Sequence, residues 1–438
     1  MRSVTSPNAP ALDATPVGEL EGARPGLPGA PGRRWIQLAL WVVVGCLVVR
    51  AFPLVREAAL HRSPCFTVYY TLSRLLVRGG ALAATYDDAT FAAELGHVQP
   101  GLVDVNVNPP TTALLALPLA GLALPTARVA WTAINLALLF AAVGWIAWEA
   151  GLGSGWVPAL VAAAIACEPI VANLDLGQAY IAMLVLEVFA WHAYRRDRSA
   201  SLGVALGLML ALKVAGVLLL LLLVVERRWR ALAWTAGTGA ALVCACWPWT
   251  SLVAWRGFAT ALSRAGRAPE ATVTAYQTLP GIIGHLTVPD TLWNPAPLFR
   301  TPEIGGWLAV GSAILAAGLL VVLARRASVT SASRFAAYAT AGVALTPLAL
   351  DYHYALLLLP VALLVGGARR SGQPLTWCAL GVAVLLLGAD LPYRSPRLAP
   401  GAWALLAYPK LYGAMLLCAL ALWRWPHDHR QETSHARA

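Results

Sequence analysis

One lysine stands inside an otherwise apolar stretch of the chain, and its type and position point to chemistry. Lys213 lies in the apolar segment 199–225, between the charged clusters 195–198 and 226–230. An ammonium group at membrane depth is costly unless it faces a wet cavity or binds an anion. The side chain could instead extend along its helix to the membrane surface. We predict that Lys213 contributes to binding or catalysis.

The two charged clusters determine how the segment around Lys213 must be arranged. Basic residues concentrate at the cytoplasmic ends of membrane helices, so both clusters should lie on the same side. A single straight helix over 199–225 would place them on opposite sides. We therefore expect a hairpin of two short helices that bends near Lys213, helped by Gly203, Gly207 and Gly216. Short helices at membrane depth require a protein-lined cavity, which is typical of membrane enzymes and transporters.

The composition identifies a membrane protein. Of 438 residues, 59% are hydrophobic and 12% are charged, about half the charged fraction of a soluble protein. The net charge of +11 resides largely in arginine pairs beside apolar spans, the pattern of cytoplasmic loops. This placement predicts contact with membrane lipids and excludes nucleic acid as a partner.

Apolar spans predict an all-α polytopic protein with about ten to twelve membrane helices. The spans fall near 35–53, 109–124, 128–149, 156–173, 179–194, the 199–225 hairpin, 231–247, 304–323, 334–349, 353–367, 374–390 and 401–423. Sidedness requires an odd number of crossings between loop 54–108 and Arg195. We therefore expect the short span 109–124, which opens with two prolines, not to cross.

Three parts of the chain are expected. Residues 1–34 form a disordered cytoplasmic tail, residues 35–424 a membrane-embedded domain, and residues 425–438 a second cytoplasmic tail. Both termini are therefore predicted to be cytoplasmic. The two large polar loops, 54–108 and 248–302, are predicted to be extracytoplasmic and to form the roof of one cavity.

The two polar loops carry most of the candidate functional side chains. Aromatic and aliphatic residues between Phe66 and Val77 recur at helical spacing, which predicts an amphipathic helix on the membrane interface. Carboxylates and aromatic rings above a helix bundle suit a sugar, because rings stack on its apolar faces and carboxylates accept hydroxyl protons. The candidates in the two loops are Tyr69, Asp87, Asp88, Asp104, Arg264, Tyr276 and Gln277.

The cysteines and histidines indicate neither a metal site nor a disulfide framework. Six of the seven cysteines lie in apolar spans, and the pair Cys244 and Cys246 lacks the spacing of metal ligands. There is also no glycine-rich phosphate loop. We expect no metal and no cofactor.

Several motifs in one order resemble glycosyltransferase family 87, whose members are polytopic enzymes of the GT-C class. The motifs are Val68-Tyr69-Tyr70; Gly79-Gly80 with Tyr86; Asn108-Pro109-Pro110 with Pro118; Glu168-Pro169; Asp175-Leu176-Gly177-Gln178; Leu212-Lys213; Arg228-Trp229; Tyr276-Gln277; Thr346-Pro347; and Asp351-Tyr352-His353-Tyr354 with Pro360. The resemblance covers residues 60–365, and the order and spacing of the motifs make it specific.

The resemblance implies a GT-C helix bundle in a bacterial plasma membrane with an extracytoplasmic active site. Its implied donor is a polyprenyl-phosphate sugar, carrying mannose or another hexose or pentose, and its acceptor is a lipid or glycan. The acceptor hydroxyl attacks the anomeric carbon, a carboxylate of the first outer loop takes the proton, and polyprenyl phosphate leaves. Lys213, His353 and an arginine such as Arg256 or Arg264 are candidates for holding the phosphate. Tyr352, Asp175 and Gln178 are further candidates for substrate binding.

One position departs from the family pattern. Where the family has an aspartate that resembles a catalytic base, this chain has Cys65. A neutral thiol is a poor base because its pKa near 8.5 leaves little thiolate at neutral pH. Three explanations stay open: Asp104, Asp88 or Asp87 has taken the role, Cys65 acts as a thiolate, or the chain is a non-catalytic family member. We favour the first explanation, with Asp104 before the other two aspartates.

Two other classes of function compete with a transferase. One is a lipid or solute transporter, although the sequence lacks the repeated halves common in transporters. The other is a non-catalytic subunit of an envelope-assembly complex. The alternatives are distinguished by whether a first-loop carboxylate lies beside Lys213 and His353.

Overall fold

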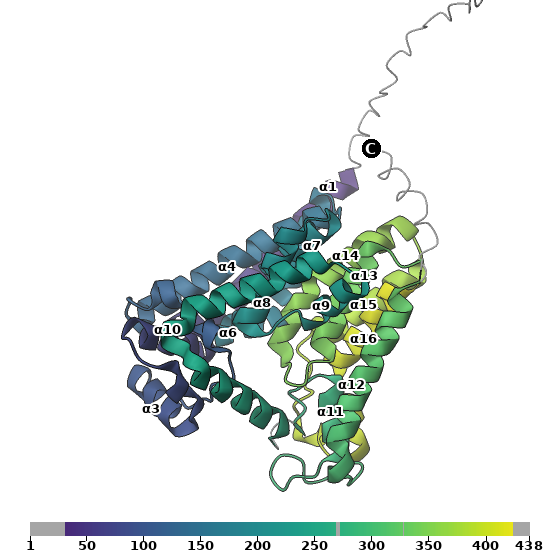
Figure 1. Ribbon diagram of the computed structural model, residues 1–438. Helices are drawn as coiled ribbons and strands as arrows, with labels where there is room; N and C mark the ends of the chain where they lie inside the picture. The colour runs from purple at the N-terminus through teal and green to yellow at the C-terminus, as the bar shows by residue number, and fades with distance from the viewer. Residues whose placement is uncertain (1–30, 269–271, 327, 424–438) are drawn as a thin grey trace, which may run out of the picture.

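A computed structural model describes residues 31–268, 272–326 and 328–423 of the chain. Over these residues the chain is helical, with the bridge between Asp290 and Asn294 as the one β-type pairing. The predicted tails at 1–34 and 425–438 lie largely outside the described residues, except that helix α1 already begins at Pro31. Figure 1 shows two groups of helices, one with α1, α4, α8 and α10 and one with α12, α13, α15 and α16, set at an angle to each other.

The helices alternate between long apolar rods and short broken pieces. The long ones are α1 (Pro31–Leu60), α4 (Leu124–Glu149), α10 (Trp229–Arg267) and α12 (Pro302–Ala324). The shorter ones are α2 (Pro64–Val77), α3 (Asp88–Val98), α5 (Val157–Ala166), α6 (Glu168–Leu176), α7 (Tyr180–Arg195), α8 (Ser199–Lys213), α9 (Val217–Val225), α11 (Leu279–Thr287), α13 (Ser331–Ala344), α14 (Leu358–Ser371), α15 (Pro374–Gly388) and α16 (Pro409–Leu422). The 3₁₀ segments used below are η1 (Leu82–Tyr86), η2 (Pro110–Leu114), η3 (Leu117–Leu119), η6 (Asp351–Leu357) and η8 (Gly401–Ala407).

The described residues form fewer long apolar helices than the sequence suggested. By length and composition, five helices among the described residues could cross a membrane, or up to seven if each bent pair is one span. The bent pairs are α5 with α6, at 57°, and η8 with α16, at 56°. The predicted count of ten to twelve is not confirmed, because apolar stretches such as 156–173 break into short helices. The segment 109–124 consists of η2, η3 and turns, as the parity of the loops required.

The hairpin predicted around Lys213 is present. Helix α8 ends at Lys213, where Val214 adopts a left-handed conformation (φ 53°), and α9 begins after Gly216 (φ 79°). The two charged clusters meet at the other end, where Arg228 pairs with Asp197 at 3.2 Å. Only Gly216 takes part in the bend. Gly203 and Gly207 instead lie where α10 approaches α8 closely.

Helix α2 is not the interfacial helix that its periodicity suggested. Nine of its side chains are buried, including Tyr69 and Tyr70, so the helix is packed inside the protein. The ring of Phe66 stacks on Trp131 of α4 at 5.2 Å. Gly177, at the end of α6, lies so close to α2 that a Cβ there would be 2.7 Å from the Phe66 side chain. The apolar face therefore contacts other helices rather than lipid.

The two large polar segments contact each other. Pro248 and the non-helical Ser251 (φ 45°, ψ 170°) kink α10, and its second half runs from the side of α3 toward α11 and α12 (Figure 1). In this half, Arg264 pairs with Asp88 at 2.9 Å, and Phe258 lies against Tyr86 with ring centroids 6.3 Å apart. The expected contact between segments 54–108 and 248–302 is thus observed.

Candidate functional site

Lys213 lies at the centre of a polar group that four different segments contribute. Its Nζ donates hydrogen bonds to the Tyr69 hydroxyl and to Asn108 Oδ1, both at 2.9 Å, and lies 3.5 Å from Gln178 Oε1. The Tyr69 hydroxyl in turn donates to Gln178. The ammonium also lies over the rings of Tyr69 and Tyr180, at 4.9 and 5.4 Å, a cation–π geometry.

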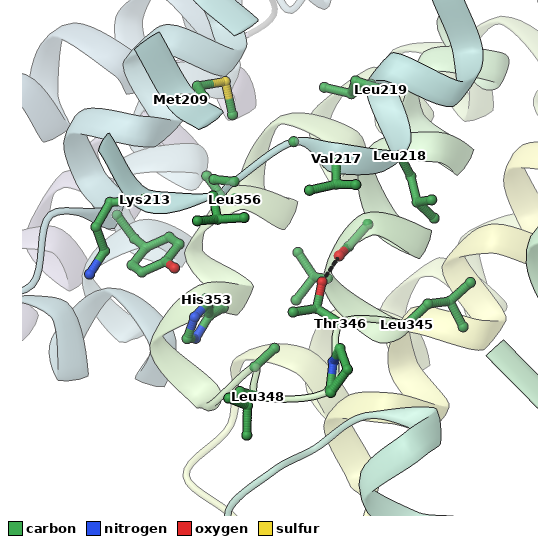
Figure 2. A pocket seen from close by; sticks show the side chains of 18 of the residues that line it. Met209, Lys213, Val217, Leu218, Leu219, Leu345, Thr346, Leu348, His353 and Leu356 are labelled. Carbon is green, nitrogen blue, oxygen red and sulfur yellow. Dashed lines mark hydrogen bonds between the residues drawn. The ribbon is translucent and has the colours of Figure 1, made fainter. Parts of the chain in front are cut away.

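This group faces a cavity of about 470 Å³. Figure 2 shows Lys213 and His353 on one side of the cavity and Leu218, Leu219 and Leu345 on the other. The cavity is thus polar on the side of α8 and η6 and apolar on the side of α9 and α13. Such a division suits a ligand with an anionic head and a hydrocarbon chain.

Aromatic rings form the wall below Lys213. The rings of Tyr352 and His353 stack at 4.5 Å, and His353 lies 4.3 Å from Tyr180. The His353 ring is held by the Leu350 backbone, with Nδ1 3.0 Å from the nitrogen and 3.1 Å from the oxygen. Asn173 joins this wall together, because its Nδ2 donates to the Tyr352 carbonyl at 2.8 Å and its Oδ1 accepts from the Tyr180 amide.

Asp104 is the first-loop carboxylate nearest to this polar group. It interacts electrostatically with both Lys213 and Cys65, although its side chain is not part of the cavity wall. Burial raises the pKa of Asp104 above its ordinary value, opposed by a hydrogen bond from the Val105 amide and by the charge of Lys213. A carboxylate with a raised pKa is a stronger base than an ordinary one.

Cys65 lies in the same place. Its thiol interacts with Gln178, Asp104 and Lys213. The position that carries an aspartate in the family pattern is therefore next to the Lys213 group, and Asp104 stands beside it.

Asp87 and Asp88 have other partners. Asp87 caps α3 by accepting hydrogen bonds from the Thr90 amide and hydroxyl, at 2.9 and 2.7 Å, which lower its pKa. Asp88 pairs with Arg264. All three of these charged groups are exposed, and none lines the cavity around Lys213.

The remaining candidates divide into two groups. Gln178 and Tyr352 belong to the site, and Tyr276 interacts electrostatically with Tyr352. Asp175 instead forms an ion pair with Arg62 at 3.6 Å. Gln277 is fully buried and donates to the carbonyls of Thr274 and Ala407, at 2.6 and 2.7 Å, which ties η8 to the loop before α11.

Three residues of the site were missed or assigned another role by sequence reasoning. Asn108 was noted only as part of the motif with Pro109 and Pro110, yet its side chain accepts a hydrogen bond from Lys213. Tyr180 stands two residues after the Asp175–Gln178 motif and lines the cavity. Glu187 lines the inner end, is 2% exposed, and its Oε2 has no hydrogen-bond partner among the described residues. A carboxyl group in the middle of an apolar span was the signal that could have revealed Glu187.

No metal-binding cluster of three or more His, Cys, Asp or Glu side chains occurs among residues 31–268, 272–326 and 328–423. Among the residues that line the cavity, Lys213 carries the positive charge.

Comparison with known proteins identifies the family. Two similar proteins are polyprenol-phosphate-mannose-dependent alpha-(1-2)-phosphatidylinositol mannoside mannosyltransferases. The one from Mycobacterium tuberculosis is 27% identical over 313 residues, which cover 67% of this chain and 69% of the relative. The one from Mycolicibacterium smegmatis is 28% identical over 316 residues, which cover 66% and 68%. No solved structure matches the chain significantly. The model of glycosyltransferase family 87 matches residues 106–360, more than half of the chain, and the protein therefore belongs to this family.

Proposed function

We propose that the protein transfers mannose from a polyprenyl-phosphate donor to a lipid or glycan acceptor on the extracytoplasmic side of the membrane. The observation that carries the proposal is the position of Lys213, whose ammonium faces a cavity with one polar and one apolar side. A prenyl phosphate has the same two parts. The relatives' dependence on polyprenol-phosphate-mannose supports mannose as the transferred sugar.

The donor's phosphate binds at Lys213. In the described part of the chain, no carboxylate lies within 4 Å of the Lys213 ammonium, whose hydrogen-bond partners are neutral oxygens. A half-buried ammonium with neutral partners favours an anionic ligand, because a charge-assisted bond then compensates its lost hydration. The prenyl chain extends from the phosphate along the apolar wall that Leu218 and Leu219 provide.

Transfer proceeds by direct displacement at the anomeric carbon. The acceptor hydroxyl oxygen forms the new bond to this carbon while the bond to the phosphate oxygen breaks. The Asp104 carboxylate takes the hydroxyl proton, and the polyprenyl phosphate leaves with its negative charge beside Lys213. The raised pKa of Asp104 favours this role, because a base is most effective when its pKa approaches the working pH.

Cys65 serves in this proposal as a neutral neighbour of the base. A thiol at the position of the family's aspartate removes one negative charge from the surroundings of Asp104 and Lys213. Asp104 interacts with Lys213 and Cys65, so its carboxylate can act as the base in place of the family's aspartate.

Sugar transfer is the direct test. The purified full chain in lipid nanodiscs is incubated with radiolabelled polyprenyl-phosphate mannose, arabinose or glucose, together with a bacterial membrane extract as acceptor. The expected result is a labelled product from the mannose donor that is absent with Lys213→Met. A labelled product from the arabinose or glucose donor alone would show that this sugar, and not mannose, is transferred.

A second measurement separates an inactive enzyme from a missing acceptor. Binding of the prenyl-phosphate donor is measured with the wild type and with Lys213→Met. No binding by the wild type would contradict the donor assignment. Binding without transfer, followed by transfer in Cys65→Asp, would show that the natural chain has lost its base and is a non-catalytic family member.

A further inference from the structure

A second cavity lies on the membrane-facing side of the molecule, between α1, α4 and the bent pair α5 and α6. Its volume is about 440 Å³. Most of its wall is apolar and includes Val48 and Phe52 of α1 and Phe140 of α4. These three side chains are at least 47% exposed, so the cavity opens toward the surface that lipid chains cover.

Three charged residues lie at the polar end of this cavity: Arg50, Glu168 and Asp390. Within the described part of the chain, none of them forms an ion pair with another side chain. Charged groups beside lipid are costly unless they have partners. Their presence at a cavity that faces the membrane therefore points to a charged ligand.

The polar end lies at the level of lipid headgroups. The apolar run of α1 that begins at Trp35 is interrupted by Arg50 near its end, continues to Val55, and is followed by Arg56 and Glu57. Arginine at the end of an apolar helix lies at the boundary between hydrocarbon and water. The apolar part of the cavity extends from there toward Leu47 and Leu139, as an acyl chain would.

The charges around this end of the cavity are balanced. Asp351 already accepts hydrogen bonds from Tyr393, at 2.7 Å, and from Arg394. Lys410 is fully buried and donates to the Leu387 carbonyl at 3.1 Å, although its charge reaches Glu168 and Asp390. The carboxylates Glu168 and Asp390 and the arginine Arg50 line the cavity, and Lys410 supplies the second positive charge near them.

This cavity is separate from the one at Lys213. Helix α6 and segment η6 lie between them and are joined by Asn173, which donates to the carbonyls of Pro169 and Tyr352, both at 2.8 Å. A ligand in the second cavity therefore does not reach the Lys213 group through this wall, and it is neither the sugar donor nor the acceptor.

We propose that the second cavity binds a zwitterionic aminophospholipid. Its primary ammonium contacts Glu168 and Asp390, its phosphate contacts Arg50, and one acyl chain lies against α1 and α4. The headgroup and the cavity carry complementary charges. The cationic group of the lipid suits the two carboxylates, and the phosphate, a few bonds away, suits the arginine. An anionic phospholipid would place its headgroup against the two carboxylates.

The test measures lipid binding by native mass spectrometry of the detergent-purified full chain. Phosphatidylethanolamine, phosphatidylcholine and phosphatidylglycerol of equal chain length compete in one mixture. We expect one phosphatidylethanolamine per chain, retained at least several-fold better than the other two. Phosphatidylcholine has a cationic group without N–H donors, so it tests the contribution of these donors. Phosphatidylglycerol has no cationic group, so it tests the contribution of the positive charge.

Variants assign the binding to this cavity. The double variant Glu168→Gln with Asp390→Asn should lose the preference for phosphatidylethanolamine, whereas Arg50→Gln should weaken phosphatidylethanolamine and phosphatidylglycerol alike. Glu303→Gln, an exposed carboxylate in the first turn of α12, is the matched control and should retain the preference. Thermal melting of each variant shows that it is folded.

Three results would overturn the proposal: equal retention of all three lipids, a preference for phosphatidylglycerol, or a dimer mass that shows a second chain in the cavity. The measurement does not involve sugar transfer, so its outcome is independent of the proposed enzymatic function.

Discussion

At the scale of single residues, the site depends on the half-buried ammonium of Lys213, which forms no ion pair with a carboxylate in the described part of the chain. The side chains that hold Lys213 are Tyr69, Asn108 and Gln178, and each offers an oxygen without a full charge. A structural lysine at this depth would normally be paired with a carboxylate. Its neutral partners orient the ammonium and leave its charge available to a phosphate.

Replacement of Lys213 by methionine should weaken donor binding strongly and leave the protein folded. Methionine has a similar length and no charge, and removal of a charge-assisted bond costs about 1.5–3 kcal/mol, or roughly 10- to 100-fold in Kd. Binding of a prenyl-phosphate analogue in nanodiscs measures the effect. Arg264→Gln is the matched control, since Arg264 pairs with Asp88 away from the cavity. Equal binding by Lys213→Met and wild type would refute the phosphate assignment.

Asp104→Asn should stop transfer while donor binding stays intact, because asparagine cannot accept the acceptor's proton. The same change should raise the melting temperature at neutral pH. Burial raises the pKa of Asp104, so the unfolded chain binds fewer protons there than the folded chain, and stability falls as pH rises through this range. Asparagine removes this cost. Retained transfer in Asp104→Asn would assign the base to another residue.

The pH profile of the wild type provides a separate prediction. A base must be ionised, so kcat/KM should fall as pH decreases through the pKa of Asp104. Because this pKa is raised, the fall should lie above the ordinary aspartate range near 3.9. Cys65→Ser should keep both the profile and most of the activity. If Cys65→Ser is inactive and Asp104→Asn is active, the Cys65 thiolate is favoured as the base.

At the scale of elements, the hairpin of α8 and α9 depends on close packing against α10. A Cβ at Gly207 would lie 2.6 Å from Thr238 Cβ and 2.8 Å from the Thr235 carbonyl, whereas a Cβ at Gly239 of α10 meets nothing within 4 Å. Gly207→Ala should therefore destabilise the protein by about 1–3 kcal/mol. Thermal melting in detergent measures the loss, with Gly239→Ala as the control. Equal melting temperatures would show that the two helices can separate at no cost.

The elements differ in how far the sequence could predict them. The charges on both sides of 199–225 required a hairpin. The positions of charged residues along one segment show on which side of the membrane its ends lie, without knowledge of the neighbouring helices. Helix α2 has the periodicity of an interfacial helix, but its apolar face packs against Trp131 instead of lipid. Periodicity shows that a face is buried without showing which partner buries it. The number of spans predicted from apolar length is likewise not confirmed, since a break such as that at Cys167 is not visible in hydropathy.

At the scale of the whole molecule, the site is formed where segments distant in sequence meet. Tyr69, Asn108, Lys213 and His353 come from four different elements. Motif order identified most of these residues individually, including Lys213 and His353. The role of Asn108 could not be predicted, because an asparagine before two prolines has the same local signature whether it caps a helix or binds a lysine.

The sidedness of the molecule leads to the last prediction. Arginine pairs at 195–196, 227–228, 325–326 and 369–370 indicate the cytoplasmic side, and segments 54–108 and 248–302 meet away from them. A reporter that is active only outside the cytoplasm, such as alkaline phosphatase, should work when inserted at the exposed Leu292. The same reporter should be inactive when fused after Ala438, where a fluorescent protein should fold. Reporter activity at Ala438 and not at Leu292 would show that the protein has the opposite orientation, with Lys213 and Asp104 on the cytoplasmic side.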